Sequence, residues 1–427
     1  MSRARGPVTT NMRPSIPDAC LCPVALAAAL VLLTACAEST VEQDRFTLTE
    51  ENGVTVAATR GGALYPAPVV RFESELILRE DPANEESLLT APTLFTQGPD
   101  GRFYVPGRRS GDIAVFSPDG TYLRRIGQYG EGPGDFTSPS VPLFTEGRIE
   151  IWDFRQQRTT SFSMDYTLLE VVRSPLNTLI IDMRTEPDGT CVVRDVASRE
   201  RDDFAATSQS ITRISASGDT LARIETAFVN SSMLSRIEVL PGQFSTMSTD
   251  IPFSTGPMAY DVPVYGILIC DGDRPDLEWY DYAGNLERII RTGLEPQPIT
   301  AAVRQAYEQR IREARAERAR ERGTTPQPLP DYPYPDHSAF FGWGYVDDAG
   351  WIWLIDIWSD YTQPDKAATT FHVIDDEGRY LGTTEIPATR FTIVNGRLLA
   401  VIENEATGAR VPTVLRIVPN ADGLIYP

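Results

Sequence analysis

The chain has 427 residues, of which 41% are hydrophobic and 23% are charged, so it can bury a large core and is not a disordered polymer. Its 39 basic and 59 acidic residues give a formal net charge of −20, which argues against sequence-independent nucleic-acid binding because that requires a basic surface. The only histidines are His337 and His372, so a metal site built from three imidazoles is excluded.

The N-terminal segment predicts export. Residues 24–33 form a ten-residue apolar run, which is too short to cross a bilayer as a helix and has the length of a signal-peptide core. The run ends in L-T-A-C, with the cysteine at position 36, and this resembles the lipobox of bacterial lipoproteins. The resemblance implies that residues 1–35 are a lipoprotein signal peptide, that Cys36 is the lipidation site, and that residues 36–52 are a tether. An ordinary secretory signal with an incidental cysteine is the alternative.

The residue after the lipidated cysteine is Ala37, not an aspartate, and by the same resemblance this implies delivery to the outer membrane. The protein is therefore expected in the cell envelope, with a lipid anchor as its membrane contact. After removal of the signal, Cys191 and Cys270 remain in an oxidising compartment and could pair. They follow their turn glycines at different distances, so two buried free thiols are the favoured interpretation.

A repeat of paired turn glycines organises the rest of the chain. Short β-rich runs flank each turn, so each pair predicts the two hairpins of a four-stranded unit. Successive first glycines are separated by 46, 42, 77, 84 and 46 residues (positions 101, 147, 189, 266, 350 and 396), and the short intervals match about 40 to 50 residues per propeller blade. The pairs are Gly101 with Gly120, Gly147 with the Asp165-Tyr166 turn, Gly189 with Gly218, Gly266 with Gly284, Gly350 with Gly378, and Gly396 with Gly423.

These turns predict an all-β fold, a six-bladed β-propeller of four-stranded blades over residues 53–427 as one domain. The blades are expected to start near residues 89, 137, 175, 256, 338 and 388. The strand-like segment 69–79 precedes the first complete blade by about one strand. We expect it to close the last blade as its outer strand, which removes an exposed sheet edge.

The two long intervals between turns predict insertions. Residues 227–257 are polar, rich in Ser and Thr and without periodicity, which predicts a long loop. Residues 298–323 predict a helix, with Thr300 as its N-cap and Gly323 as its stop. Beyond Ile311 this helix offers only Ala, Glu and Arg, so its far half is expected to be a solvated arm; a partner-binding helix is the alternative.

One loop carries a family resemblance. The sequence G-E-G-P-G-D-F at Gly130–Phe136, together with G-D-I-A-V-F-S-P-D-G at 111–120, resembles the bacterial six-bladed β-propeller proteins related to NHL repeats. In those proteins such a loop links an outer strand to the next inner strand. The resemblance implies the fold and a lipoprotein setting, and it implies no established activity.

The predicted ligand face consists of the loops that join second to third strands and outer strands to the next inner strands. These loops are rich in charged and aromatic residues, although exposure alone also makes loops polar. They span residues 106–111, 127–138, 153–158, 195–206, 271–276, 356–369 and 402–411. The candidates for ligand contact are Arg108, Arg109, Glu131, Asp135, Arg155, Arg158, Asp271, Arg274, Trp358 and Tyr361.

Four aspartates fall at the same point, just past the second strand of their blades: Asp153, Asp195, Asp271 and Asp356. One role repeated four times favours turn capping over ligand binding. A metal site is the alternative for other carboxylates, since a lactonase-like propeller would hold a divalent cation such as calcium by oxygen ligands. The candidates for that site are Asp182, Glu186 and Asp261, which fall short of a ring of ligands.

The favoured functional hypothesis is a non-enzymatic envelope module that binds a protein, peptide or glycan through the loop face, with no cofactor and no catalytic residue. The sequence contains no Walker loop, dinucleotide fingerprint, Cys-x-x-Cys motif or EF-hand loop. A metal-dependent propeller hydrolase or lyase is the alternative, and a structural scaffold of an envelope assembly is a third hypothesis.

Overall fold

The computed structural model describes residues 45–427, except residues 146, 202–203, 241–242, 264, 364–367, 389 and 404–407. The second of the chain's two units, Phe46–Pro427, contains all of the strands and helices described below. The predicted signal peptide and Cys36 lie outside the described residues. Within these, no helix is long and apolar enough to cross a membrane.

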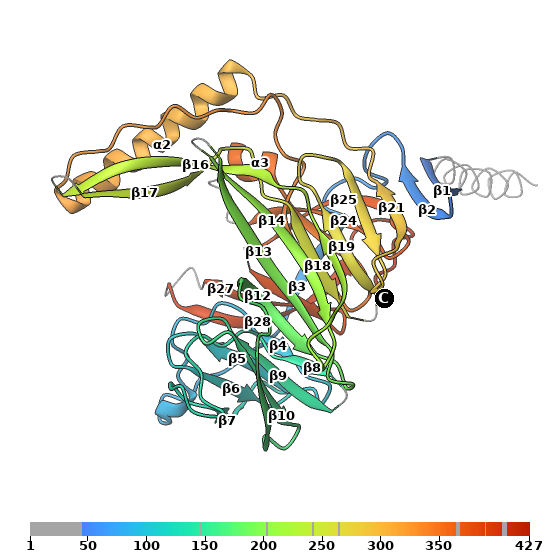
Figure 1. Ribbon diagram of the computed structural model, residues 1–427, viewed down its shortest axis with the longest axis vertical. Coiled ribbons are helices and arrows are strands. Elements are labelled where there is room, and N and C mark those ends of the chain that lie inside the picture. The colour runs from blue at the N-terminus through green and yellow to red at the C-terminus, as the bar shows by residue number, and fades with distance from the viewer. Residues whose placement is uncertain are drawn as a thin grey trace, which may run out of the picture. The chain divides into compact units, whose positions relative to one another are not determined.

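Six sheets make up the second unit, and each has a core of four antiparallel strands (Figure 1). Blade 1 contains β4 (Thr96–Gln97), β5 (Phe103–Gly107), β6 (Asp112–Phe116) and β7 (Tyr122–Ile126). Blade 2 contains β8 (Leu143–Thr145), β9 (Arg148–Asp153), β10 (Arg158–Ser163) and β11 (Leu168–Arg173). Blade 3 contains β12 (Leu179–Thr185), β13 (Cys191–Arg201), β14 (Phe204–Ile214) and β15 (Thr220–Glu225).

The remaining three blades follow the same plan, with a helix between the fourth and the fifth. Blade 4 contains β18 (Met258–Val262), β19 (Gly266–Cys270), β20 (Asp276–Tyr280) and β21 (Leu286–Arg291). Blade 5 contains β22 (Phe341–Val346), β23 (Ile352–Asp356), β24 (Thr369–Ile374) and β25 (Tyr380–Ile386). Blade 6 contains β26 (Phe391–Val394), β27 (Arg397–Glu403), β28 (Arg410–Pro419) and β3 (Val70–Ile77). The short helix η1 (Glu85–Ser87) precedes blade 1.

The turn residues explain why the chain reverses where the sequence predicted. The turn glycines adopt positive φ, which costs glycine little. At Gly266 (φ 121°) a Cβ would lie 2.3 Å from the carbonyl oxygen of Tyr280, so no larger residue fits there. In blade 2, Tyr166 occupies the corresponding position at φ 70°. Gly423 differs from the prediction because it follows β28 in the C-terminal tail and joins no two strands.

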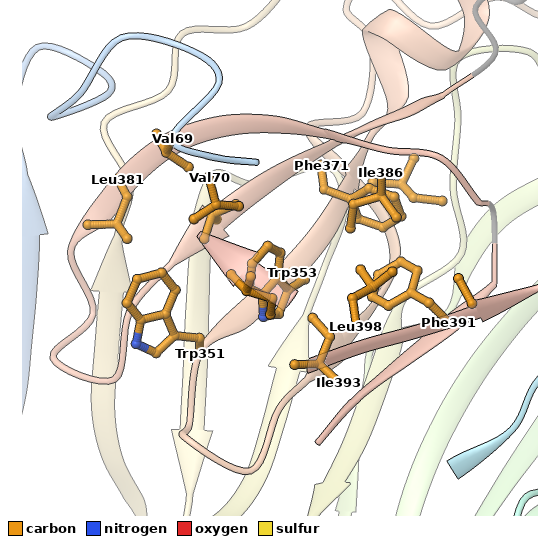
Figure 2. Packing of buried hydrophobic residues seen from close by; sticks show 14 of the residues in the cluster. Val69, Val70, Trp351, Trp353, Phe371, Leu381, Ile386, Phe391, Ile393 and Leu398 are labelled. Carbon is orange, nitrogen blue, oxygen red and sulfur yellow. The ribbon is translucent and has the colours of Figure 1, made fainter. Parts of the chain in front are cut away.

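Blade 6 is closed by the N-terminal part of the chain. Strand β3 pairs antiparallel with β28, from Val70 opposite Pro419 to Ile77 opposite Thr413. Figure 2 shows the core where blades 5 and 6 meet, in which Trp353 and Phe371 of blade 5 lie near Phe391 of blade 6. All three side chains are buried. The pairing joins the two ends of the domain in one sheet, so β28 is paired on both sides and is not an edge strand.

The C-terminal tail packs against blade 5 through a buried carboxylate. The ring of Tyr426 stands edge-on to Trp351 at 4.8 Å, and its hydroxyl donates to Asp347 at 2.7 Å. Asp347 also accepts hydrogen bonds from the Trp353 indole (2.9 Å) and the Trp351 backbone (2.8 Å). Burial raises the pKa of Asp347 to about 6, although the hydrogen bonds from Trp353, Tyr426 and Trp351 oppose this rise.

This carboxylate predicts a pH dependence of stability. Because the pKa in the folded state lies above the unfolded value of about 3.9, the folded state holds the proton more tightly. Protonation of Asp347 therefore adds about 3 kcal/mol to the free energy of unfolding. This stabilisation is fully present below about pH 4 and is lost as the pH rises through about 6. The test is urea unfolding of the wild type and of Asp347→Asn at pH 4.5 and at pH 7.5. From pH 4.5 to pH 7.5 the free energy of unfolding of the wild type should fall more than that of Asp347→Asn. Parallel pH profiles of the two proteins would contradict the assignment.

The N-terminal end of the domain departs from the prediction. Residues 46–51, expected to belong to a tether, form β1 (Phe46–Glu51), which pairs with β2 (Val54–Thr59). Strand β2 adds to blade 4 in parallel with β21. Val56 and Ala57 are fully buried, which is why this hairpin stays on the sheet. The Asn52-Gly53 pair at the turn, both at positive φ, is a hairpin signal in the sequence.

The insertion at 227–257 is also different from the prediction. It contains a hairpin of β16 (Val229–Leu240) and β17 (Gln243–Asp250), not a loop. Strand β14 pairs with β15 at one end and with β16 at the other, so blade 3 continues into this hairpin. Polar strands rich in Ser and Thr show no alternation of apolar residues, so the sequence pattern does not reveal them.

The helical insertion contains α2 (Ala301–Arg322). The Thr300 side chain accepts a hydrogen bond from the backbone N–H of Val303 (3.3 Å), and Gly323 ends the helix in the left-handed region at φ 64°. Most residues of the far half are exposed, but the far half is not solvated on every side. Ala319 is buried, and Arg315 donates to the carbonyl oxygen of Pro328 at 2.8 Å, so the returning proline-rich segment covers one side of the helix.

Candidate functional site

A channel of about 870 Å³ runs along the inner strands of the domain. Every blade contributes to its lining, for example through Gln97, Leu143, Met183, Tyr260, Tyr345 and Thr392. Arg108 and Phe154, from the loops after the second strands of blades 1 and 2, line it on the predicted ligand face. Asp348 and Asn395 line it at the turns of the opposite face. The channel therefore reaches the loop face.

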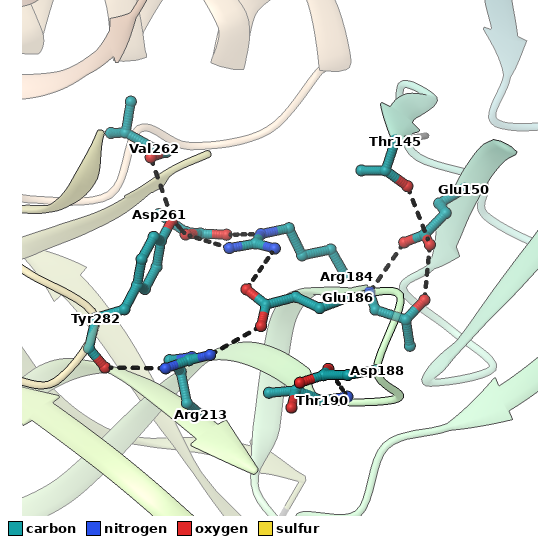
Figure 3. Close-up of polar contacts among 11 residues, drawn as sticks. Thr145, Glu150, Arg184, Glu186, Asp188, Thr190, Arg213, Asp261, Val262 and Tyr282 are labelled. Carbon is teal, nitrogen blue, oxygen red and sulfur yellow. Dashed lines mark hydrogen bonds and ion pairs between the residues drawn. The ribbon is translucent and has the colours of Figure 1, made fainter. Parts of the chain in front are cut away.

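A polar network lies where β12 and β18 end (Figure 3). The Arg184 guanidinium donates to Asp261 at 2.5 and 3.3 Å and to Glu186 at 3.1 Å. Arg213 donates to the second oxygen of Glu186 at 2.9 Å, and the Tyr282 hydroxyl donates to Asp261 at 2.6 Å. Burial opposes the charge of Arg184, but Asp261 outweighs it and raises the pKa of Arg184 above its ordinary value. The network ties blade 3 to blade 4.

The carboxylates proposed for a metal site are occupied by arginines. Asp261 and Glu186 both bind Arg184, and Asp182 forms an ion pair with Arg194. Over the described part of the chain, no group of three or more His, Cys, Asp or Glu side chains is arranged to hold a metal ion. Because each carboxylate already faces a guanidinium, these residues do not fit a divalent cation.

Glu150, another carboxylate that lines the channel, also has hydrogen-bond partners within the protein. It is 3% exposed and accepts hydrogen bonds from the backbone N–H (3.0 Å) and the hydroxyl (2.7 Å) of Thr185. Sequence reasoning identified neither Glu150 nor Arg184. Their role depends on partners 35 and 77 residues away in the chain, and a local motif carries no such signal.

Arg158, predicted to contact a ligand, instead holds the glycine-rich loop. Its side chain is 4% exposed and donates to the carbonyl oxygens of Glu131 (3.0 Å), Gly132 (2.7 Å) and Asp135 (2.9 Å). Burial lowers the pKa of Arg158. The G-E-G-P-G-D-F loop is therefore fixed to blade 2 by a buried cation that donates hydrogen bonds to three of its carbonyl oxygens.

The other candidates on the loop face do not form one site. Arg108, Arg109, Glu131 and Arg155 are exposed, and of these Arg108 lines the channel. The remaining ones contact neighbours: Arg274 pairs with Asp271 at 3.0 Å, while Trp358 and Tyr361 lie 6.2 and 4.8 Å from the Phe253 ring. Trp358 and Tyr361 belong to α3 (Ile357–Thr362), which occupies part of the predicted loop 356–369.

Two of the four repeated aspartates, Asp153 and Asp356, bind backbone groups, and the other two bind side chains. Asp153 accepts hydrogen bonds from the backbone N–H groups of Thr137 (2.6 Å) and Gln156 (3.0 Å), and Asp356 caps α3 through Ser359. Burial opposes ionisation of Asp153, but the backbone hydrogen bonds outweigh it and lower its pKa. Asp195 accepts from the Ser210 hydroxyl, and Asp271 pairs with Arg274. Cys191 and Cys270 are buried and free, as expected.

A second pocket of about 330 Å³ was not anticipated from the sequence. We call it the rim pocket; Gln209, Met258, Trp343 and Asp360 are among its lining residues. Met258 and Trp343 lie at the starts of the inner strands β18 and β22, and Asp360 lies on α3 after the second strand of blade 5. These positions place the rim pocket on the loop face. Trp343 is 41% exposed, unlike the other large residues of blade 5.

Residues 89–240 match the model of the family DUF5128, which is described as a 6-bladed beta-propeller. No curated protein matches the chain in sequence. The chain is similar in structure to a protein of Bacteroides fragilis described as exported, with 12% identity, a TM-score of 0.46, and coverage of 84% of this chain and 98% of that one. It is similar to a DUF4221 family member from Bacteroides vulgatus, with 10% identity, a TM-score of 0.43, and coverage of 83% and 100%.

A third similar structure is virginiamycin B lyase from Staphylococcus aureus, with 9% identity, a TM-score of 0.36, and coverage of 81% of this chain and 99% of that one. The fold itself rests on the six sheets around one channel and on the family match. Both agree with the arrangement predicted from the paired turns. The chain is a six-bladed β-propeller.

Proposed function

We propose that this propeller is an envelope-anchored, non-enzymatic binding module that recognises a protein, peptide or glycan through its loop face. The observation that carries the proposal is the channel of about 870 Å³ that reaches this face. A cavity of this size is within the range of ligand sites, and its lining offers both apolar surface and polar groups to a ligand.

The state of the charged lining residues supports binding. Arg184 and Asp261 neutralise each other within the channel wall, as do Arg194 and Asp182. Arg108 is different, because it is exposed and makes no hydrogen bond or ion pair with the described residues. A channel wall whose ion pairs are internal, with the uncommitted Arg108 at its loop-side mouth, can orient a ligand.

The proposed lipid anchor of the protein rests on the sequence. The apolar run at 24–33 and the lipobox-like cysteine at position 36 support an outer membrane lipoprotein. Strand β1 begins at Phe46, so only a short segment separates Cys36 from the propeller. Metabolic labelling with palmitate that persists in Cys36→Ala would contradict this part of the proposal.

A channel-filling variant tests the binding role. Ser140 lines the channel and its hydroxyl donates only to the neighbouring carbonyl of Val141, so Ser140→Trp fills the channel at little cost to the fold. The full-length chain is applied to arrays of short peptides and of bacterial cell-wall glycans. We expect the wild type to bind a subset of array members and Ser140→Trp to bind them at least about tenfold more weakly, a difference of about 1.4 kcal/mol.

The matched control is Leu123→Trp, because Leu123 lies on the outer strand β7 and is 46% exposed. It adds the same indole away from the channel and should bind as the wild type does. Equal binding by the wild type and Ser140→Trp, or no array member bound above background, would refute the channel as the ligand site.

A further inference from the structure

We infer that the rim pocket binds a cationic group on an aliphatic stem, such as the ammonium of lysine or the guanidinium of arginine. This inference rests on the proposed function, because it assigns a chemical class of ligand to the same loop face. The pocket is built by three blades and α3: Gln209 comes from β14, Met258 from β18, Trp343 from β22 and Asp360 from α3.

Trp343 gives the pocket an aromatic wall. The indole contacts Phe371 edge-on at 6.2 Å and Phe391 at 6.3 Å, yet it remains 41% exposed. The flanking glycines leave no space for larger residues, since a Cβ on Gly344 would lie 2.0 Å from the Trp353 carbonyl oxygen. The glycines therefore let the neighbouring strand approach closely, and the Phe371 and Phe391 rings support the indole. A tryptophan face attracts a cation placed over it, more strongly than any other aromatic side chain does.

Asp360 gives the pocket its charge. It is the only ionisable side chain among the residues that line the pocket. Its carboxylate has no hydrogen bond or ion pair within the part of the chain that the structure describes, whereas Asp356, the N-cap of the same helix, accepts hydrogen bonds from Ser359. Desolvation raises the pKa of Asp360 and Asp356 adds to the rise, as expected for a carboxylate that lacks a bound cation.

Arg310, a cation that acts on Asp360, has another partner. Arg310 of α2 lowers the pKa of Asp360 from a distance, but its guanidinium donates to the Tyr361 carbonyl oxygen at 2.8 Å. A carboxylate that only accepts hydrogen bonds requires a donor, and a positive donor is favoured where no cation lines the site. The net charge of −20 attracts cations toward the whole molecule.

Other ligand classes use only part of this pocket. A neutral saccharide would stack on Trp343 and donate hydroxyls to Asp360, but its binding would not depend on the negative charge. A proline-rich peptide would also stack on the indole, but proline has no N–H to offer to the carboxylate. An amine or guanidinium uses both the indole and the charge, and its aliphatic stem matches the apolar lining at Met258 and Ile357.

The test uses the full-length chain and a glycine pentapeptide with lysine at its centre, compared with the same peptide carrying ε-acetyl-lysine. Binding is measured by calorimetry at low and high salt. We expect the lysine peptide to bind and the acetylated peptide not to bind. Trp343→Ala and Asp360→Asn should each weaken binding at least about tenfold, and 0.5 M salt should weaken wild-type binding.

Asp273→Asn is the matched control, since Asp273 is an exposed aspartate of the loop after β19 and does not line the rim pocket. It should bind as the wild type does. Trp343→Phe keeps an aromatic face and should retain most of the binding, which separates loss of the cation site from loss of folding. A competition measurement adds free n-butylamine to the complex with the lysine peptide. Displacement of the peptide would show that the amine alone is enough for binding, and no displacement would show that the peptide backbone contributes; both results support a cation site.

The inference is overturned if Asp360→Asn binds the lysine peptide as well as the wild type does, or if acetylation has no effect. Those results would indicate a neutral ligand. The channel proposal is independent of this outcome: if Ser140→Trp loses its array ligands while Trp343→Ala keeps them, the binding function stands and the rim pocket is not its cation site.

Discussion

Replacing Trp353 with alanine is expected to lower the free energy of unfolding by about 3–5 kcal/mol. Trp353 is fully buried and stacks on Trp351, with ring centroids 6.2 Å apart. Truncation would leave a cavity between blades 5 and 6. It would also remove the indole N–H that donates to Asp347 at 2.9 Å, so a buried carboxylate would lose one of its partners.

The measurement is urea or guanidinium unfolding of the full-length chain at pH 7, with the midpoint and slope compared between variants. Leu123→Ala is the control, because Leu123 on β7 is 46% exposed and its truncation should change stability by at most about 0.5 kcal/mol. A loss of less than about 1 kcal/mol for Trp353→Ala would mean that this junction does not hold the ring together.

Substitution of Arg184 by methionine should destabilise the protein by about 3–5 kcal/mol. The Arg184 side chain is only 10% exposed and faces Asp261 and Glu186 in the network of Figure 3. Methionine keeps much of the volume but leaves Asp261 without its cation, and an uncompensated carboxylate in a buried site is costly. Glu186 retains Arg213, so most of the loss should come from Asp261.

A second substitution tests that explanation. Arg184→Met combined with Asp261→Asn should recover part of the lost stability, because no bare carboxylate remains. Arg148→Met is the surface control: Arg148 and Glu170 are 42% and 44% exposed, and breaking such a pair should cost at most about 1 kcal/mol. If Arg184→Met unfolds within about 1 kcal/mol of the wild type, the network contributes little to holding blades 3 and 4 together.

Features that depend on neighbouring residues were predictable. Glycines at turns, Thr300 as a helix N-cap and Gly323 as a helix stop act within a few residues, so the chain order reveals them. The Asn52-Gly53 hairpin was equally local and could have been predicted from the same rules. The hairpin of β16 and β17 could not, because its polar strands lack an apolar pattern.

The loop-face residues illustrate the limit of such reasoning. Arg158 and Arg108 both lie next to loops of the predicted ligand face, and nothing in their local sequence tells them apart. The fold buries Arg158 under three carbonyl oxygens and leaves Arg108 exposed beside the channel. Trp343 looks like a core residue of an inner strand, and only the surrounding blades show that its indole is accessible.

The sequence by itself therefore determined the six-blade plan, the closing strand and the helical insertion, because turn conformation, capping and strand spacing are local properties. The tertiary structure alone decided which carboxylates are neutralised and which pockets remain open. Arg184 meets Asp261 across 77 residues, and the channel needs all six blades. Charge pairing and cavity shape depend on contacts between distant parts of the chain, and these exist only once the ring has closed.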